Sequence, residues 1–327
     1  SDSFSVLNHS KIYNQMALGK LLLEPNTLWS KVDVQTQHAL QCGALQSIAT
    51  HCERIEQADI SFIVRTLVNW KRKQEAKQQQ DRKTAESGQF FNPFLPCETD
   101  LFLTNISDTH CCLLNKYNVV DRHLLIVTRE FEQQDNWLTF ADFAALWACL
   151  AEDDGLAFYN GGAEAGASQP HKHLQLVPLS LADGGVQVPI DPLVSTCLGD
   201  RHPGTVTTIP QFPFQHAIAP LDPTWADSPW DAAEFTLSCY RSLLRQVGLI
   251  QDTETMGDRQ SKPYNLLATR RWMMVVPRQQ ERYQSISVNS LGFAGMLLVR
   301  NPTEMEMLKT IQPIALLQSV TFPLTKS

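Results

Sequence analysis

The sequence predicts an α+β fold in which helices flank an antiparallel sheet and the chain is built from two related halves. The chain has 327 residues, which exceeds the ~250–300 residues at which a single hydrophobic core usually stops growing. Short apolar runs separated by polar breaks are typical of antiparallel strands. In addition, the order strand, strand, helix, strand occurs twice along the chain.

The elements of the first half follow from apolar periodicity and turn residues. Thr139 is predicted to cap a helix over 139–152, because Asp142 three residues later gives a capping-box pattern with Asp in place of Glu. The other elements expected in this half are a helix over 10–24, a strand or short buried helix over 60–69, and strands over 101–106, 111–116, 123–128, 156–159 and 171–179.

A proline-rich segment is predicted to separate the two halves. Eight of the eighteen prolines lie between 189 and 229, which indicates a long irregular connection. We therefore expect a first half over 1–188, this connection over 189–229, and a second half over 230–327. The second half is expected to contain a helix over 234–247, a pair of strands over 264–276, a strand over 296–300 and a closing helix over 303–319.

The charge balance argues against nucleic acid as a partner. The chain has 27 Lys and Arg against 34 Asp and Glu, a formal net charge of −7, whereas sequence-independent binding to nucleic acid needs a basic surface. Residues 71–83 are a local exception with six basic side chains, which fit either a solvated linker or a basic flap over an anionic substrate. No apolar run reaches the ~18 residues of a membrane-spanning helix, and no secretory signal is visible, so no membrane association is expected.

The eight cysteines are dispersed, and none belongs to a Cys-x-x-Cys pair. This pattern predicts free thiols in a reducing compartment, and therefore a cytoplasmic location. Because structural zinc sites usually need paired ligands, we expect no protein-bound zinc.

The stretch over 158–179 carries the chemistry. Side chains alternate between the two faces of a strand, so His171, His173 and Gln175 are expected to share one face. A glycine-rich loop precedes them, and its small residues are expected to leave backbone amides uncovered as an anion-binding nest. The residues of this loop are Gly161, Gly162, Gly166 and Ala167, and Asn160 and Ser168 add side-chain donors.

This arrangement fits an attack by imidazole on phosphorus. A neutral histidine, whose ordinary pKa is ~6.5, offers a lone pair at neutral pH. A covalent histidine–phosphorus intermediate divides a difficult transfer into two displacements. The loop amides and Ser168 would stabilise charge on the non-bridging oxygens, and Gln175 would hold a phosphoryl oxygen without titrating. Two other interpretations stay open, a metal-binding His-x-His pair and histidines that are satisfied core residues.

The segment over 168–175, Ser-Gln-Pro-His-Lys-His-Leu-Gln, resembles the signature of the ATP adenylyltransferases, also called diadenosine tetraphosphate phosphorylases. They belong to the transferase branch of the histidine-triad superfamily, alongside the galactose-1-phosphate uridylyltransferases. The resemblance covers most of 90–320 and implies a histidine-triad-like fold with reversible phosphorolysis of diadenosine tetraphosphate to ATP and ADP. The stretches that resemble further parts of the family are 92–103, 113–128, 264–269 and 289–295.

The resemblance also implies roles for single residues. His173 matches the histidine that becomes adenylylated, and His171 matches the one that orients the site. Gln175 replaces the third histidine of the hydrolase branch, and Asn115 falls where the family holds the ribose; for His123 we expect a structural role. The family's phosphate contacts fall on Asn160, Gly166, Ala167 and Ser168, and a lysine in 71–83 is a further candidate. A divalent ion, Mg²⁺, is expected to travel with the polyphosphate rather than in a protein cage.

Three alternatives are weighed against this function. A histidine-triad hydrolase is disfavoured by Gln175. A hexose-1-phosphate uridylyltransferase is disfavoured because Lys172 stands where those enzymes usually carry proline, and because paired zinc ligands are missing. A nucleotide sensor without turnover is disfavoured by the intact His173. The expected partners are small molecules, namely a dinucleoside polyphosphate, ATP, ADP and phosphate, and a monomer is favoured.

Overall fold

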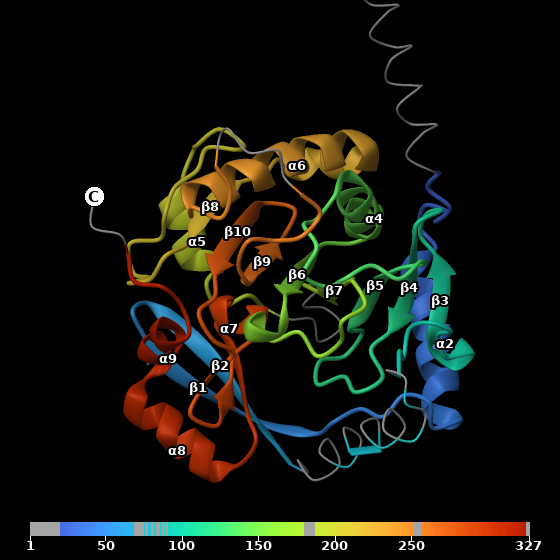
Figure 1. Ribbon diagram of the computed structural model, residues 1–327, viewed down its shortest axis with the longest axis horizontal. Coiled ribbons are helices and arrows are strands. Elements are labelled where there is room, and N and C mark those ends of the chain that lie inside the picture. The colour runs from blue at the N-terminus through green and yellow to red at the C-terminus, as the bar shows by residue number, and fades with distance from the viewer. Residues whose placement is uncertain are drawn as a thin grey trace, which may run out of the picture.

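A central eight-stranded sheet organises the protein (Figure 1). The computed structural model describes residues 20–68, 91–179, 187–251 and 257–324, together with positions 75, 78, 79, 82, 86 and 88. The strand order is β3-β4-β5-β7-β6-β9-β10-β8, and every neighbouring pair is antiparallel. The predicted α+β class with an antiparallel sheet is therefore confirmed. The strands are β3 (Phe102–Asn105), β4 (His110–Leu114), β5 (Leu124–Thr128), β6 (Gly155–Gly161), β7 (His173–Pro178), β8 (Ala217–Pro220), β9 (Tyr264–Ala268) and β10 (Trp272–Pro277).

The sheet contains the same unit twice. In the first unit β5 is followed by α4 (Phe140–Leu150) and by the pair β6 and β7, which lie in the spatial order β5-β7-β6. In the second unit β8 is followed by α6 (Pro229–Gln246) and by β9 and β10, in the mirrored order β9-β10-β8. The units meet where β6 pairs with β9 and Asn160 lies opposite Asn265. This repetition agrees with two related halves, and the seam between them runs through the middle of the sheet.

Helices α4 and α6 cover one face of the sheet and lie together in Figure 1. The Thr139 hydroxyl accepts a hydrogen bond from the backbone amide of Asp142, and the Asp142 carboxylate accepts one from the backbone amide of Thr139. The predicted capping box is therefore confirmed. Trp147 of α4 is fully buried and donates from Nε1 to Thr236 of α6 over 2.7 Å. This contact satisfies two polar groups inside the larger hydrophobic core and fixes the two helices side by side.

A smaller sheet covers part of the opposite face. It contains β1 (Thr50–Gln57), β2 (Ile60–Leu67) and β13 (Met296–Val299), and β2 pairs in parallel with β13. Residues 60–69 were predicted to be either a strand or a short helix, and the strand is correct. The remaining elements are η1 (Thr99–Leu101), η2 (Ala163–Ala165), β11 (Arg282–Tyr283), β12 (Ile286–Ser287) and the helices α5 (Asp191–Leu198), η4 (Pro223–Asp227), α7 (Ser290–Phe293), α8 (Pro302–Ile311) and α9 (Pro313–Ser319).

Several predicted boundaries were wrong. Residues 10–19 of the expected first helix lie outside the described residues, and 20–24 are not helical; α2 (Leu28–Gln41) was missed. The segment 189–229 was expected to be irregular but contains α5, η4 and β8, because several of its prolines stand in the first turn of a helix, where the missing N–H costs nothing. Pro313 likewise divides the closing helix into α8 and α9.

The structure bears on two further expectations, the absence of a membrane-spanning helix and the presence of free thiols. Among the described residues, no helix combines the length and the apolar character that a membrane span requires. All eight cysteines are described, and each is a free thiol. The division into halves at 188 and 230 stays a prediction.

Candidate active site

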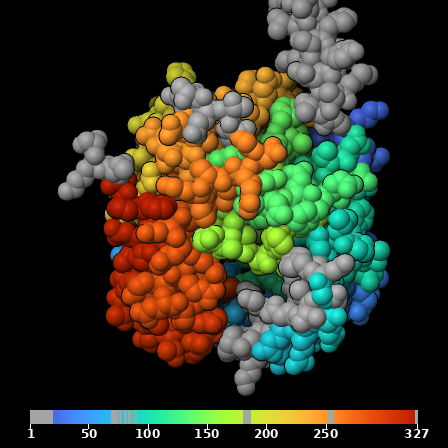
Figure 2. All heavy atoms as spheres, viewed as in Figure 1, coloured from blue at the N-terminus to red at the C-terminus, as the bar shows by residue number. Residues whose placement is uncertain are grey.

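The predicted site residues meet where β7 begins, on the sheet face opposite α4. His173 lies across from Val127 of β5, and Gln175 lies across from Leu125. His171 precedes β7 and is held by a bridge to Gln133. The segment that contains η2, yellow-green in Figure 2, reaches the surface beside this region, above a hollow between the two halves.

The Nε2 atom of His173 carries an available lone pair. Nδ1 lies 2.8 Å from the carbonyl oxygen of His171, and a carbonyl can only accept, so Nδ1 bears the proton and Nε2 does not. Burial lowers the pKa of His173 to about 4, so the ring is neutral at physiological pH. Among the described residues, Nε2 has no hydrogen-bond partner. The side chain therefore presents an unprotonated imidazole nitrogen.

His171 is fixed through both ring nitrogens. Nε2 donates to the carbonyl oxygen of Thr128 over 2.8 Å, and Nδ1 accepts from the side-chain amide of Asn92 over 2.9 Å. Burial lowers its pKa, although the hydrogen bond to Thr128 acts in the opposite direction. Phe94 packs against the rings of His171 and His173, with centroids 5.7 and 5.2 Å away. Neither Asn92 nor Phe94 was among the predicted site residues, although the stretch 92–103 resembles part of the family.

Gln175 is oriented by a chain of side-chain hydrogen bonds. The amide of Asn115 donates to Nδ1 of His123 over 3.1 Å, so Nε2 of His123 carries the proton that it donates to Oε1 of Gln175 over 2.8 Å. Burial lowers the pKa of His123 to about 4, against the opposing effect of Gln175. These bonds occupy the oxygen of Gln175, while its amide nitrogen has no hydrogen-bond partner among the described residues.

Gln134, which was not predicted as a site residue, joins the two strands that frame the site. Its Oε1 accepts from the amide of His173 over 2.8 Å. Its Nε2 donates to the carbonyl of Asn160 over 2.8 Å and to that of His173 over 3.2 Å. The glutamine therefore replaces ladder bonds between β6 and β7 at the point where the strands diverge. Nothing in its local sequence distinguishes it from a loop residue.

The glycine-rich loop differs from its prediction in one respect. Its amides were expected to be uncovered, but the turn uses them itself: Gly162 donates to Asn160, Gly166 to Ala163, and Ala167 to Gly162. Gly166 has φ +91°, and a Cβ there would lie 2.9 Å from the Cβ of Asn289. These small residues therefore shape the turn and do not supply free amides.

Asn160 and Ser168 keep donors that the loop does not use. Oδ1 of Asn160 accepts from Asn265 and from Ser290 of the second half, whereas its Nδ2 has no partner among the described residues. Ser168 is exposed at the end of the turn. The donors that stay available at this edge are thus side chains rather than the backbone amides of the predicted nest.

A buried ionic network lies on the other face of β7. Lys172 is fully buried and contacts Oδ2 of Asp142 at 2.7 Å, the carbonyl of Trp137 at 2.9 Å and Glu132 at 3.2 Å. His110 approaches the other oxygen of Asp142 at 3.0 Å. Burial would raise the pKa of Asp142, but Lys172 and His110 outweigh it and hold this pKa well below its usual range. The network anchors the residue between the two histidines.

Two cavities border the site. One cavity has a volume of about 490 Å³ and is lined by Asn115, His123 and residues of α2. The other has a volume of about 470 Å³ and is lined by Ser168, Gln134 and residues of the turn after β6. Hydrogen bonds connect both to the strand of His173, through Gln175 on one side and Gln134 on the other. Of the six basic residues of 71–83, only Arg82 belongs to the described part of the chain. Within that part, neither His171 nor His173 belongs to a group of three side chains that could hold a metal ion.

Comparisons with known proteins support the resemblance seen in the sequence. The family model for the Ap4A phosphorylase N-terminal domain matches residues 19–196, and that for the ATP adenylyltransferase C-terminal domain matches residues 210–323. Two relatives come from Saccharomyces cerevisiae. Diadenosine 5′,5‴-P1,P4-tetraphosphate phosphorylase 2 is 30% identical over 66% of this chain and 70% of its own length. Protein APA1 is 33% identical over 58% of this chain and 61% of its own length.

A solved structure shares the fold. The crystal structure of yeast Ap4A phosphorylase Apa2 in complex with Ap4A superposes with a TM-score of 0.73 and 24% identity. The superposition covers 93% of this chain and 100% of that one. The likeness therefore extends over both halves.

Proposed function

Because the chain belongs to the Ap4A phosphorylase family, we propose that it catalyses the reversible phosphorolysis of diadenosine tetraphosphate, in which the dinucleotide and phosphate give ATP and ADP. The observation that carries this proposal is the unprotonated Nε2 of His173, whose Nδ1 proton is held by the carbonyl of His171. An imidazole in this tautomer is a competent nucleophile toward phosphorus.

In the first step, the Nε2 lone pair of His173 attacks the α-phosphorus of one adenylyl group. The nitrogen–phosphorus bond forms while the bond from phosphorus to the bridging oxygen breaks, so ATP leaves with that electron pair. Positive charge develops on the ring during the attack, and the His171 carbonyl, 2.8 Å from Nδ1, stabilises it. ATP is a leaving group of low pKa, so the step needs no strong general acid.

In the second step, an oxygen of phosphate attacks the same phosphorus. The nitrogen–phosphorus bond breaks, ADP forms, and the lone pair returns to Nε2 of His173. The two displacements use the same groups in opposite directions, which makes the reaction reversible. His171 takes no proton in either step; it is a positioning residue, held at both ring nitrogens.

Side chains around His173 would bind the substrate. Because His123 occupies the oxygen of Gln175, the amide nitrogen of Gln175 would donate to a non-bridging oxygen. Nδ2 of Asn160 and the hydroxyl of Ser168 would do the same from the opposite strand, over the tight turn at Gly166 and Ala167. Asn115 would hold the ribose through its side-chain oxygen, since its nitrogen bonds to His123.

Mg²⁺ would enter with the polyphosphate as part of the substrate. Hard oxygens of phosphate and water suit this ion, and we assign it no ligand from the protein. We further propose that the protein works in the cytoplasm as a monomer on small molecules, without nucleic acid or membrane partners. The eight free thiols and the net charge of −7 support these points.

Phosphate dependence and adduct formation test the function together. Incubation with diadenosine tetraphosphate and phosphate should give ATP and ADP, while omission of phosphate should leave one ATP per enzyme and one AMP on the protein by intact mass. His173→Ala should lower this single turnover by about 10³-fold or more. His202→Ala, at an exposed histidine outside the site, is the matched control. Equal turnover without phosphate would instead indicate a hydrolase.

A further inference from the structure

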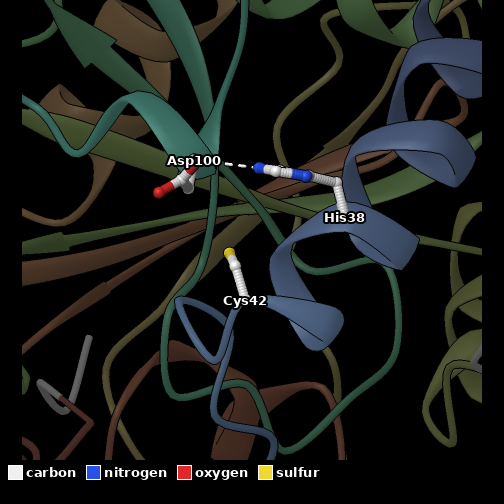
Figure 3. A group of neighbouring side chains, drawn as sticks. All are labelled: His38, Cys42 and Asp100. Carbon is white, nitrogen blue, oxygen red and sulfur yellow. Dashed lines mark hydrogen bonds and ion pairs between the residues drawn. The ribbon is translucent and has the colours of Figure 1, made fainter.

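Three potential metal ligands meet on the surface where α2 ends against η1 (Figure 3). The ligand atoms of His38, Cys42 and Asp100 all lie within 4.8 Å of one another. We propose that this group is a binding site for a borderline divalent transition metal ion of the zinc type. It lies apart from the residues of the proposed reaction and does not depend on that proposal.

Helix geometry aligns the first two ligands. His38 and Cys42 are four residues apart, and the Cys42 amide donates to the His38 carbonyl over 3.0 Å, so the last turn stays helical up to Cys42. Residues at this spacing are neighbours on one helix surface. The carboxyl end of a helix also carries partial negative charge, which favours a bound cation.

The third ligand comes from a separate element that packs against α2. Asp100 lies in η1, and its carbonyl accepts a hydrogen bond of 2.7 Å from the side chain of Gln35 on α2. Its carboxylate already contacts Nε2 of His38 at 2.7 Å. Figure 3 shows the three side chains converging on one space. The site is therefore largely formed before a metal binds.

The donor set matches the proposed ion. A neutral imidazole, a thiolate and a carboxylate are all zinc ligands, and together they carry two negative charges that a divalent cation would neutralise. On binding, the thiol of Cys42 would release its proton to solvent, and the proton that Nε2 of His38 donates to Asp100 in the metal-free protein would move to Nδ1, so that Nε2 could bind the ion. Water would complete the coordination.

The geometry requires only a small adjustment. Metal–ligand distances of about 2.1 Å at tetrahedral angles separate two ligand atoms by about 3.4 Å, against 2.7 Å between His38 and Asp100 now. Both of these side chains are 51% exposed, so they can rotate by this amount without disturbing the core. The bound ion would then join α2 to the segment that leads into β3.

The sequence predicts no protein-bound zinc because no Cys-x-x-Cys pair is present, and the helix over 28–41 was not predicted. Without α2, the spacing of His38 and Cys42 has no structural meaning. Once the helix is known, the pair becomes a chelating arrangement.

Titration of the full chain with Co²⁺, followed by competition with Zn²⁺, tests the site. Wild type should show a near-ultraviolet band from thiolate-to-cobalt charge transfer. Cys42→Ser should lose this band and bind Zn²⁺ at least about 10-fold more weakly. Cys52→Ser, which removes another exposed free thiol, should behave as wild type.

A second variant tests the site independently of any effect of Cys42→Ser on the fold. Asp100→Asn should retain the thiolate band but bind Zn²⁺ about 10–100-fold more weakly. A wild-type protein without the band, a band that survives in Cys42→Ser, or equal affinity in wild type and Asp100→Asn would overturn the proposal.

Discussion

Replacing Lys172 with methionine should remove a large part of the stability of this protein. The side chain is fully buried, and its ammonium group contacts Asp142, which is 1% exposed, at 2.7 Å. Methionine keeps most of the apolar stem but leaves the carboxylate of Asp142 buried without its main counter-charge. Loss of one partner from a buried ion pair costs about 3–5 kcal/mol.

The structure indicates which contacts make up this cost. The contact with Glu132 contributes little, because that side chain is 43% exposed and screened pairs are worth about 0–1 kcal/mol. The carbonyl of Trp137 also loses its donor, which costs about 1 kcal/mol or more for a buried acceptor. We therefore expect a loss of about 4 kcal/mol at pH 7, against the ~5–15 kcal/mol of typical proteins.

The cost should depend on pH with a definite sign. Lys172 and His110 hold the pKa of Asp142 below its usual range against burial, so in the wild type this carboxylate stabilises the fold above its unfolded pKa of ~3.9. Without Lys172, burial raises the pKa of Asp142 in the folded protein. Protonation of this carboxylate then relieves the unpaired charge as the pH falls. The difference between variant and wild type should therefore be largest near pH 7 and smaller near pH 5.

Urea unfolding followed by tryptophan fluorescence measures this effect. The double variant Lys172→Met/Asp142→Asn is the control, because it removes both charges and keeps an amide oxygen that can bond to Thr139. It should regain at least about 2 kcal/mol relative to Lys172→Met. A single-variant loss below about 1 kcal/mol, or a double variant at least as unstable as the single one, would refute the reasoning.

Three further predictions concern the site. The rate of adenylylation by diadenosine tetraphosphate without phosphate should stay constant from pH 8 to below 5.5, because the pKa of His173 is lowered to about 4; an acid limb near 6.5 would contradict this. Asn92→Ala should slow adenylylation about 10-fold by leaving Nδ1 of His171 unpaired, with unchanged nucleotide affinity by calorimetry. Gly166→Ala should cost at least about 2 kcal/mol in urea unfolding, because its Cβ would lie 2.9 Å from a neighbouring Cβ. Gly204→Ala, at φ +81° with open space, should cost less, and equal losses would argue against a steric cause.

The alternation of side chains along a strand made the positions of His173 and Gln175 predictable. His173 and Gln175 share a face of β7 because residues two apart on a strand always do. Contacts that depend on the path of distant loops could not be inferred in this way. Asn92 reaches His171 from 79 positions away, and Gln134 reaches the main chain of His173 across 39.

The failures at α2 and in the glycine-rich loop have different causes. In α2 only Leu28, Val32 and Ala39 are buried. This apolar stripe is so narrow that the sequence, which also contains β-branched residues, shows no clear helical periodicity. In the loop, composition indicated conformational freedom correctly at Gly166. It could not show that the short helix η2 would use the amides of the turn for its own hydrogen bonds.

The second half completes the site of the first. Asn265 of β9 donates to the side-chain oxygen of Asn160 over 2.9 Å and to the carbonyl of Ala165 over 2.8 Å. Arg278, which is also buried, donates to Asn265 and, over 3.4 Å, to Ala165, and burial lowers its pKa to about 9. The turn beside His173 is thus held from across the seam. No histidine occurs in 264–277, where β9 and β10 correspond to β6 and β7. The second unit repeats the strand order without a counterpart of His173, and its polar core instead holds the turn that carries Asn160 and Ala165.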